Sequence, residues 1–299
     1  FPERAKPMLN AAEILRTRKQ EFAELMALEM GKPVSQGIGE IEKCASVCEY
    51  YAEKAEAFLT NEQIETDASK SFVTFQPLGI VLAIMPWNFP FWQVFRFVAP
   101  GLMAGNCGVL KHASNVPGCA LAIEEVLRLA GFPENAFRTL LVSSSAVPAI
   151  IENPLIKAVT LTGSTEAGKQ VAEQAGRALK KVVLELGGSD AYVVLKDADL
   201  EVAAETCVNA RLINSGQSCI AAKRFIVELP VLGDFTRKFL EKMSLKKLGD
   251  PLSEDTYIGP QAREELRDRL HDQVERSVAA GARCILGGTK PEGNNAFYP

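Results

Sequence analysis

The strongest constraint on the fold of this chain is the alternation, from Gly79 onwards, of short apolar runs with stretches of helical periodicity. Ile80 to Met85 is a continuous apolar run, and Ala158 to Thr162 is a second one. A strand without alternating polar residues is buried on both faces, which is typical of a parallel sheet covered by helices. Helical patterns over Gly118 to Ala130 and Glu166 to Lys180 alternate with these runs. The sequence therefore predicts an α/β fold with a wound parallel sheet.

Further elements flank this region. Before it, residues 8–31 and Val34 to Leu59 have the periodicity of helices, and Phe72 to Phe75 that of a hairpin or edge strand. After it, the pattern predicts strands at Val182 to Leu186, Tyr192 to Leu195, Arg224 to Val227 and Cys284 to Leu286, and helices at Asp199 to Leu212, Phe235 to Leu245 and Pro260 to Ala280. Gly187-Gly188 would let the chain cross over, so we expect a second domain from residue 187.

Composition excludes several classes of function. The chain has 33 Lys+Arg and 37 Asp+Glu, a net charge of −4, and no basic block, which argues against nucleic-acid binding. No run approaches the roughly 20 apolar residues of a membrane span, and no leader is visible. The 7 cysteines form no disulfide framework and, with 2 histidines, predict no metal site. We expect a cytoplasmic protein with reduced cysteines that does not associate with membranes.

One motif resembles a phosphate-binding loop. Gly163 to Lys169 fits G-x-x-x-x-G-K between a strand and a helix. However, Gln170 follows where a Ser or Thr would hold magnesium, and Glu166 would repel phosphate, so a phosphohydrolase is disfavoured. Gly163 and Ser164 could still present N–H groups to a phosphate at the start of a helix, or form a plain tight turn.

Three residues are candidates for chemistry at an acyl centre. Cys219 follows Gly-Gln-Ser in a turn, where it is either a nucleophile or a small buried side chain. Glu185 ends an apolar run, where a buried carboxylate is costly unless it forms an ion pair or serves as a general base. Asn88, in Pro-Trp-Asn-Phe-Pro after a buried strand, could donate to an oxyanion or stabilise a turn. A thiol hydrolase would also need a histidine near Cys219, and neither His112 nor His271 has a suitable setting.

Taken together, these motifs resemble those of the aldehyde dehydrogenase superfamily, and within it the bacterial succinate-semialdehyde dehydrogenases. The motifs that carry the resemblance are Pro86-Trp87-Asn88-Phe89-Pro90, Lys111-His112-Ala113-Ser114, Gly163-Ser164-Thr165, Leu184-Glu185-Leu186-Gly187-Gly188 and Gly216-Gln217-Ser218-Cys219. The resemblance implies a Rossmann-like NAD(P)-binding domain at residues 1–186, with an oligomerisation hairpin at about 62–77. Residues 187–299 would be the N-terminal part of an α/β catalytic domain, in a chain truncated at both ends.

The resemblance also implies roles for individual residues. Cys219 would attack the aldehyde, Asn88 would stabilise the oxyanion, and Glu185 would activate water to hydrolyse the thioester. The nucleotide would lie along Ile84, Trp87, Asn88, Gly163, Ser164, Leu186 and Gly187, with Lys111 at the adenosine ribose. Ser114 stands where many NAD-using relatives have a glutamate, which favours NADP over NAD as cofactor.

Arg96 matches an arginine that contacts the carboxylate of succinic semialdehyde in some relatives, which makes this aldehyde the expected substrate. A second arginine of some relatives is replaced by Ile213. The full-length parent is expected to be a homo-oligomer. The alternative is a truncated, catalytically inactive aldehyde-dehydrogenase-like protein with a binding or structural role.

Overall fold

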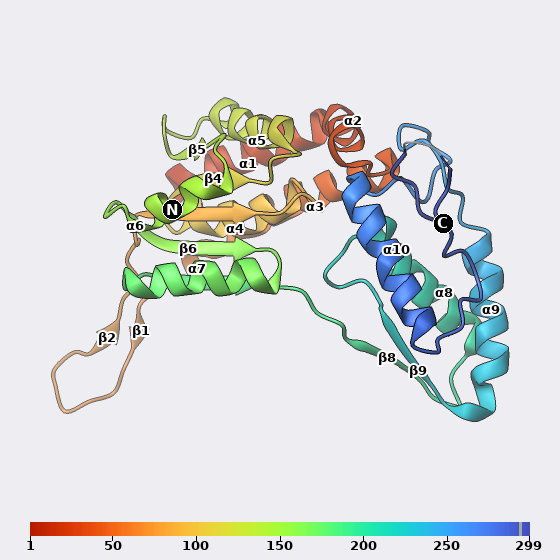
Figure 1. Cartoon of the computed structure of the whole chain (residues 1–299). Helices are drawn as coiled ribbons and strands as arrows, with labels where there is room; N and C mark the ends of the chain where they lie inside the picture. The colour runs from red at the N-terminus through yellow and green to blue at the C-terminus, as the bar shows by residue number, and fades with distance from the viewer. Residues whose placement is uncertain (293–294) are drawn as a thin grey trace. The chain divides into compact units, whose positions relative to one another are not determined.

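The computed structural model describes residues 1–292 and 295–299. Contacts divide the chain into two compact units, each described here by itself. The first comprises residues 1–22 and 38–186, and the second residues 23–37 and 187–299. Figure 1 labels most of the helices and strands of both units.

A five-stranded parallel sheet forms the centre of the first unit. Its order is β5-β4-β3-β6-β7. The strands are β3 (Ile80–Met85), β4 (Cys107–His112), β5 (Phe137–Thr139), β6 (Ile156–Thr162) and β7 (Lys181–Glu185). The first predicted apolar run is thus β3, and the second forms the main part of β6. These two strands pair with each other in the interior of the sheet, where both faces of a strand are buried.

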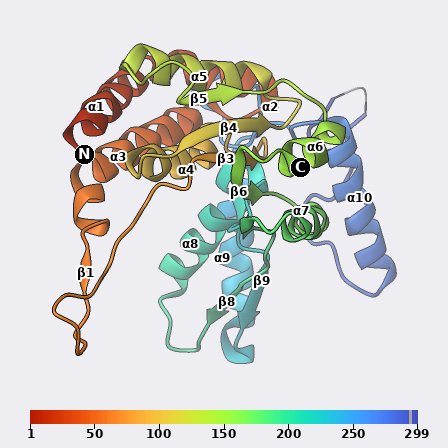
Figure 2. The ribbon, with the colours of Figure 1, turned by 90° about the vertical axis from the view of Figure 1, so that its left-hand side faces the viewer.

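Helices cover the sheet in the order that right-handed crossovers dictate. The helices of this unit are α1 (Pro2–Thr17), α4 (Trp92–Met103), α5 (Pro117–Ala130), α6 (Val147–Glu152) and α7 (Thr165–Arg177), with part of α2 (Lys19–Met30) and most of α3 (Val34–Phe58). The α4 and α5 connections run from β3 towards one edge, whereas α6 and α7 run towards the other, so the two pairs lie on opposite faces (Figure 2). The direction of winding therefore reverses between β3 and β6.

The α6–α7 face has an aliphatic core. Leu82, Val159 and Leu161 from the two central strands pack with residues of α6 and α7, namely Val147, Ile151, Val171 and Ala175. All of these side chains are buried. The predicted α/β fold with a parallel sheet is confirmed.

The structure corrects two predictions about elements and adds four elements that were not predicted. Residues 8–31 form two helices instead of one, because Arg18 leaves helical geometry (ψ 17°) and its guanidinium pairs with Glu21 and Glu125. The predicted strand from Cys284 to Leu286 is wrong. A strand needs a neighbour to take its backbone hydrogen bonds, and no segment of the described chain pairs with these residues. Helix α4, strands β4 and β5 and helix α6 are present without having been predicted.

A short antiparallel hairpin precedes the sheet. It consists of β1 (Glu62–Gln63) and β2 (Phe72–Val73), as the alternation at Phe72 to Phe75 predicts. The apolar side chains Ile64, Phe72, Val73 and Phe75 are all exposed.

The second unit is built on a two-stranded parallel sheet. Strands β8 (Ala191–Val194) and β9 (Arg224–Val227) pair in it, and the helices are α8 (Leu200–Leu212), α9 (Leu232–Ser244) and α10 (Glu264–Ala279), with single turns at Ile213–Gly216 and Leu229–Val231. Val194, Ala204, Cys207 and Phe235 form its core, surrounded by the rings of Tyr192, Phe225 and Phe239.

Residues 23–37 belong to the second unit because they bond to its backbone. The Val34 N–H donates to the carbonyl of Pro251, and the Gln36 amide donates to the carbonyl of Tyr257 at 2.8 Å. The Gln36 Oε1 atom also accepts from the N–H of Asn214 at 2.8 Å. The two units are therefore interleaved in sequence, with the second returning at Gly187. In the described residues, no helix is long and apolar enough to cross a membrane.

Candidate functional site

The first candidate region is a cavity at the carboxyl ends of β3, β4 and β6, where the winding reverses. Wound α/β sheets bind ligands at such a switch point. The cavity has a volume of about 290 Å³ and is lined by Ile84, Lys111, Ser144, Ser145 and Gln170, among others. Ile84 and Lys111 are register partners on β3 and β4.

Lys111 brings a positive charge into this cavity. Burial lowers the pKa of its ammonium group, since desolvation disfavours the charged form. Within residues 1–292 and 295–299 no ion pair to Lys111 is present. A half-buried cation that lacks a protein counter-charge fits an anionic ligand such as a phosphate. Ser164 caps α7, because its hydroxyl accepts from the N–H of Ala167 at 3.2 Å.

The loop that carries Trp87 and Asn88 is held at its far end by two side chains. The Glu40 carboxylate accepts from the N–H groups of Phe91 and Trp92, both at 2.9 Å, and so caps the start of α4. The His112 Nε2 atom lies 3.0 Å from the carbonyl oxygen of Pro90. Both side chains are buried, so the end of this loop is fixed from α3 and from β4.

The geometry determines the tautomer of His112. Its Nδ1 atom accepts from the N–H of Ala113 at 2.9 Å, so the proton is on Nε2, which donates to Pro90. Burial lowers the pKa of this imidazole to about 4, against the smaller opposing effect of the backbone hydrogen bonds. His112 is therefore neutral at pH 7 and serves as a hydrogen-bond donor.

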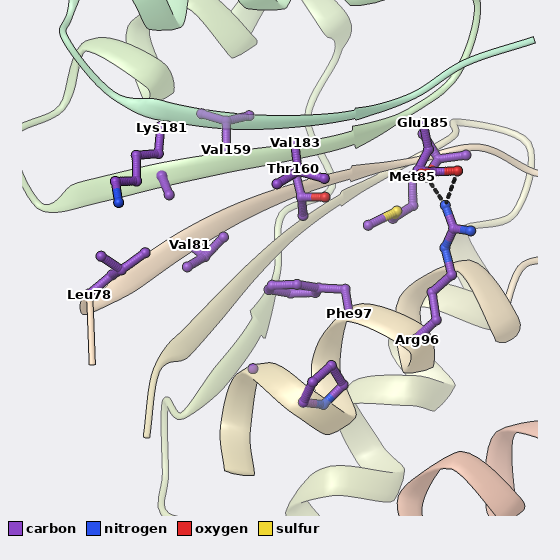
Figure 3. Close-up of a pocket in the computed structure, with 14 residues that line it drawn as sticks. Leu78, Val81, Met85, Arg96, Phe97, Val159, Thr160, Lys181, Val183 and Glu185 are labelled. Carbon is purple, nitrogen blue, oxygen red and sulfur yellow. Dashed lines mark hydrogen bonds and ion pairs between the residues drawn. The ribbon is translucent and has the colours of Figure 1, made fainter. Parts of the chain in front are cut away.

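Arg96 and Glu185 meet in a second cavity, on the other face of the sheet. This cavity has a volume of about 510 Å³ and lies between α4 and the strands β3, β6 and β7. The Arg96 Nη2 atom donates to the Thr162 hydroxyl at 2.8 Å and lies 3.5 Å from the Glu185 Oε2 atom. Figure 3 shows Arg96 reaching from α4 to Glu185 at one end of the cavity, with Lys181 at the other end.

The predicted burial of Glu185 is wrong. Strand β7 is the edge of the sheet and is half exposed along its length, and the Glu185 side chain is 55% exposed. The cost of burying a carboxylate therefore gives no argument for its function. What distinguishes Glu185 is its position at the strand end, beside a cation and next to Thr162, its register partner on β6.

Cys219 lies in a turn of the second unit, after α8. Its thiol is free and half-buried. The preceding residues Asn214 and Ser215 both have φ of 54°, a left-handed conformation that costs non-glycine residues free energy. Hydrogen bonds offset this cost: the Asn214 amide donates to the carbonyl of Gln217, and the Ser215 hydroxyl accepts from the N–H of Gly259.

Two cationic side chains donate to carbonyls of the Cys219 loop. Arg211 donates to the carbonyls of Gly216 and Ala222, both at 2.8 Å. The Lys223 ammonium lies 2.9 Å from the carbonyl of Cys219 and 3.1 Å from that of Ala221. These bonds tie both ends of the turn to its flanks, so the position of the Cys219 backbone is well defined.

The structure brings some predicted residues together and separates others. Ile84 and Lys111 share the first cavity, and Arg96 and Glu185 the second. Trp87, Asn88, Ser114, Gly163, Ser164 and Leu186 belong to the same unit but are not among the residues that line these cavities. Cys219 and Gly187 belong to the second unit. Among the described residues, no three His, Cys, Asp or Glu side chains are grouped to hold a metal ion.

The sequence patterns did not predict the contacts of five residues near the candidate site: Glu40, His112, Thr162, Arg211 and Lys223. Each acts through a contact with a residue distant in sequence or with a backbone atom, as Glu40 does with Phe91. Only His112 has a local signal, because alternation along β4 places it on the buried side of the strand.

Comparison with known proteins relates the chain to one family. The model of the "Aldehyde dehydrogenase family" matches residues 1–299. The chain is 52% identical, over 299 residues, to a Synechocystis protein named "Probable succinate-semialdehyde dehydrogenase [NADP(+)]". It is 49% identical, over 302 residues, to "Succinate-semialdehyde dehydrogenase [NADP(+)]" of Mycobacterium leprae. Both alignments cover 100% of this chain and 66% of the relative, so the chain spans about two thirds of the length of these relatives.

A solved structure agrees in fold. The crystal structure of succinic semialdehyde dehydrogenase from Streptococcus pyogenes, in complex with NADP+, superposes with a TM-score of 0.96 at 36% identity. The superposition covers 99% of this chain and 65% of that one.

Proposed function

Because the chain belongs to the aldehyde dehydrogenase family, we propose that it carries an NADP+-dependent oxidation of an aldehyde to its carboxylic acid, with succinic semialdehyde as substrate. The observation that carries the proposal is the pairing of Arg96 with Glu185 in one cavity of the first unit. That cavity combines a cation for a substrate carboxylate with a carboxylate able to serve as a base. The names of the Synechocystis and Mycobacterium leprae relatives support the same substrate.

The switch-point cavity is the proposed nucleotide site. Lys111 supplies a cation that no acid neutralises within the described residues, and Ser114 is exposed and uncharged beyond the end of β4. A 2′-phosphate on the ribose would meet attraction from Lys111 and no repulsion from residue 114, which favours NADP+ over NAD+. Ile84, Trp87, Asn88, Gly163, Ser164, Leu186 and Gly187 are proposed to lie along the rest of the nucleotide. When bound, NADP+ supplies the acceptor for the hydride.

The residue roles follow from chemistry that these groups can perform. The Cys219 thiolate forms a bond to the aldehyde carbon as the C=O π bond breaks, and the Asn88 amide and the Cys219 N–H donate to the resulting oxyanion. Re-formation of the C=O bond would expel the hydride to the acceptor that bound NADP+ supplies, which leaves a thioester on Cys219. Glu185 takes a proton from water, which attacks the thioester and releases the acid and the Cys219 thiol. Arg96 holds the distal carboxylate of the substrate throughout.

The test is formation of NADPH from succinic semialdehyde, monitored by absorbance. The chain should produce NADPH, and Cys219→Ala should abolish production. Cys284→Ala is the matched control, because Cys284 is a free, exposed cysteine of the same unit; it should retain activity. Activity that survives in Cys219→Ala would refute the role of this cysteine.

A second candidate is an inactive aldehyde-dehydrogenase-like protein with a binding or structural role. It predicts binding of NADP+ with no NADPH formation in either the chain or Cys219→Ala. The two measurements together therefore separate the candidates.

The β1–β2 hairpin is proposed as an oligomer contact. Within residues 1–292 and 295–299 its two strands pair with each other alone, and its apolar side chains Ile64, Phe72 and Val73 are exposed. Such an uncovered hairpin favours pairing with another chain. Sedimentation should show a homo-oligomer that Phe72→Lys dissociates.

The proposed location is the cytoplasm, in keeping with the absence of disulfides among the 7 cysteines.

A further inference from the structure

One nitrogen of Arg96 serves two partners that the strand ends bring together. Thr162 and Glu185 are the last residues of β6 and β7 and are register partners. The Arg96 Nη2 atom donates to the Thr162 hydroxyl at 2.8 Å and lies 3.5 Å from Glu185 Oε2. Thr162 is buried, whereas Glu185 is largely exposed. The contact with Thr162 is thus the fixed one, and the contact with Glu185 is the replaceable one.

The interaction between the charges of Arg96 and Glu185 is weak. Both side chains reach solvent, at 29% and 55% exposure, and the separation of 3.5 Å is long for a charge-assisted hydrogen bond. Exposed pairs contribute little to stability. A second carboxylate that enters the cavity can therefore replace Glu185 on Arg96 at small cost.

We propose that the substrate carboxylate displaces Glu185 from Arg96, so that recognition of the substrate releases the base. This inference rests on the proposed function, in which Arg96 holds the distal carboxylate and Glu185 takes a proton from water. Arg96 keeps its bond to Thr162 and exchanges one carboxylate for another, so Arg96 has a carboxylate partner in both states. An aldehyde that lacks a distal carboxylate leaves Glu185 paired with Arg96.

Through this exchange Arg96 affects specificity in two ways: it binds the substrate carboxylate, and it releases Glu185 only when that carboxylate is present. An uncharged aldehyde can form the thioester but meets a base that is still held by Arg96. Its hydrolysis is therefore about two- to fivefold slower than that of a succinyl thioester, the factor that an exposed ion pair implies. Selectivity would then appear in the hydrolysis step, in addition to substrate affinity.

Succinate, the expected product, tests the exchange on the chain itself without any need for turnover. Methyl NMR follows its binding through Met85 and Val183, which line the cavity beside Arg96 and Glu185. Glu185→Gln should tighten succinate binding about two- to fivefold, the range that an exposed ion pair implies. Arg96→Gln should weaken binding about tenfold or more, since a charge-assisted hydrogen bond is lost. Lys181→Gln, at the far end of the same cavity, is the matched control and should change Kd less than twofold.

A double-mutant cycle separates exchange from simple repulsion between Glu185 and succinate. If the two carboxylates compete for Arg96, then Glu185→Gln should have no effect in the Arg96→Gln background. NMR titration measures millimolar Kd values, so the weakened variants stay within reach. An unchanged Kd in Glu185→Gln, or an equal gain in both backgrounds, would overturn the exchange while leaving the proposed function intact. Failure of every variant, including the natural chain, to bind succinate would instead contradict the proposed substrate.

Discussion

At the scale of single residues, His112 links strand β4 to the loop that carries Asn88. It sits beside Lys111 in sequence, but its imidazole is buried and neutral and donates to Pro90. Removing such a buried donor leaves the Pro90 carbonyl without this bond, which costs more than the bond itself contributes. We propose that its role is to position the loop.

His112 should give the first unit a distinctive pH dependence. Its folded pKa is about 4 and its ordinary value is 6.5. The unfolded chain therefore takes up the proton first as the pH falls, so the stabilisation is complete above pH 6.5 and is lost progressively towards pH 4, by about 3 kcal/mol. Urea unfolding followed by fluorescence measures this directly, because both tryptophans, Trp87 and Trp92, lie in the first unit.

The variant His112→Gln should remove this dependence between pH 6.5 and pH 4.5. Below that range, paired carboxylates of the first unit take over, as for Glu49, whose pKa is lowered by its hydrogen bond to Arg16. An unaltered slope of stability against pH in His112→Gln would contradict the assignment.

Cofactor preference should depend on residue 114. Ser114→Glu places a carboxylate at an exposed position three residues beyond Lys111, where it would repel a 2′-phosphate and accept from ribose hydroxyls. We expect the ratio of the Kd values for NADP+ and NAD+ to rise about tenfold, which is roughly 1.4 kcal/mol. Isothermal titration with both nucleotides measures the ratio, with Ser46→Glu, at an exposed serine of α3 that does not line the cavity, as the control. A constant ratio in Ser114→Glu would reject the assignment.

At the scale of elements, helix α7 contacts the end of β7 through a glycine. A Cβ atom on Gly168 would lie 2.6 Å from the side chain of Leu186, whereas one on Gly176, two turns later, would meet nothing. Gly176→Ala should therefore stabilise the first unit by about 0.5–1 kcal/mol, through helix propensity. Gly168→Ala should be less stable than Gly176→Ala by about 1–3 kcal/mol, because Leu186 must move. Equal unfolding free energies would show that the close approach is unimportant.

The Cys219 loop should open when its cationic contacts are removed. Arg211 is mostly buried, burial lowers the pKa of its guanidinium, and it bonds to two loop carbonyls. In Arg211→Met those carbonyls lose their donor, and we expect amide exchange over residues 213–222 to accelerate about tenfold or more. Arg237→Met, an exposed arginine of α9 paired with Glu241, is the control. Hydrogen-exchange mass spectrometry that finds the same rates in both variants would contradict this role.

Hydrophobic periodicity predicted the elements that have a single uninterrupted apolar pattern. It missed the elements that mix apolar with charged residues or proline, and those that are too short to show a period. β3 and most of β6 are continuous apolar runs, and α5 has a single apolar face, so each was identified. β4 ends in Lys111 and His112, whose charges obscure the strand, and α4 contains Pro100 and Arg96 within an apolar stretch. β5 has three residues and α6 six, too few to show a period. The strand expected at residues 284–286 had the right composition but has no neighbour to pair with within the described chain.

The candidate site was predictable as far as it is encoded in local motifs. Cys219, Asn88, Lys111 and Glu185 could be named from the sequence, and their roles remain proposals. The Arg96–Thr162–Glu185 contact could not be predicted, since it depends on which strands become neighbours: β6 and β7 are joined through α7, and α4 lies over them from a distant part of the chain.

At the scale of the whole molecule, nucleotide binding should be visible as stability. A ligand that binds only the folded chain stabilises it by RT ln(1 + [L]/Kd), about 2.7 kcal/mol at a hundredfold excess over Kd. NADP+ should thus raise the unfolding midpoint reported by Trp87 and Trp92, and Lys111→Met should lose most of this gain. Lys169→Met, an α7 lysine that does not line the cavity, is the control. A midpoint that NADP+ leaves unchanged would argue against the switch-point cavity as its site.

The interleaving of the two units has a consequence for synthesis. Residues 23–37 leave the ribosome early, yet Gln36 bonds to Asn214 and Tyr257, which follow it by 178 and 221 residues. The end of α2 and the start of α3 can therefore pack into the second unit only after most of the chain has been made. Until then, residues that are buried in the folded chain, such as Met26, Met30 and Val34, stay exposed to solvent. Apolar surface exposed for that time is a target for chaperones and for aggregation. The yield of folded protein should accordingly depend on how quickly translation delivers the second unit.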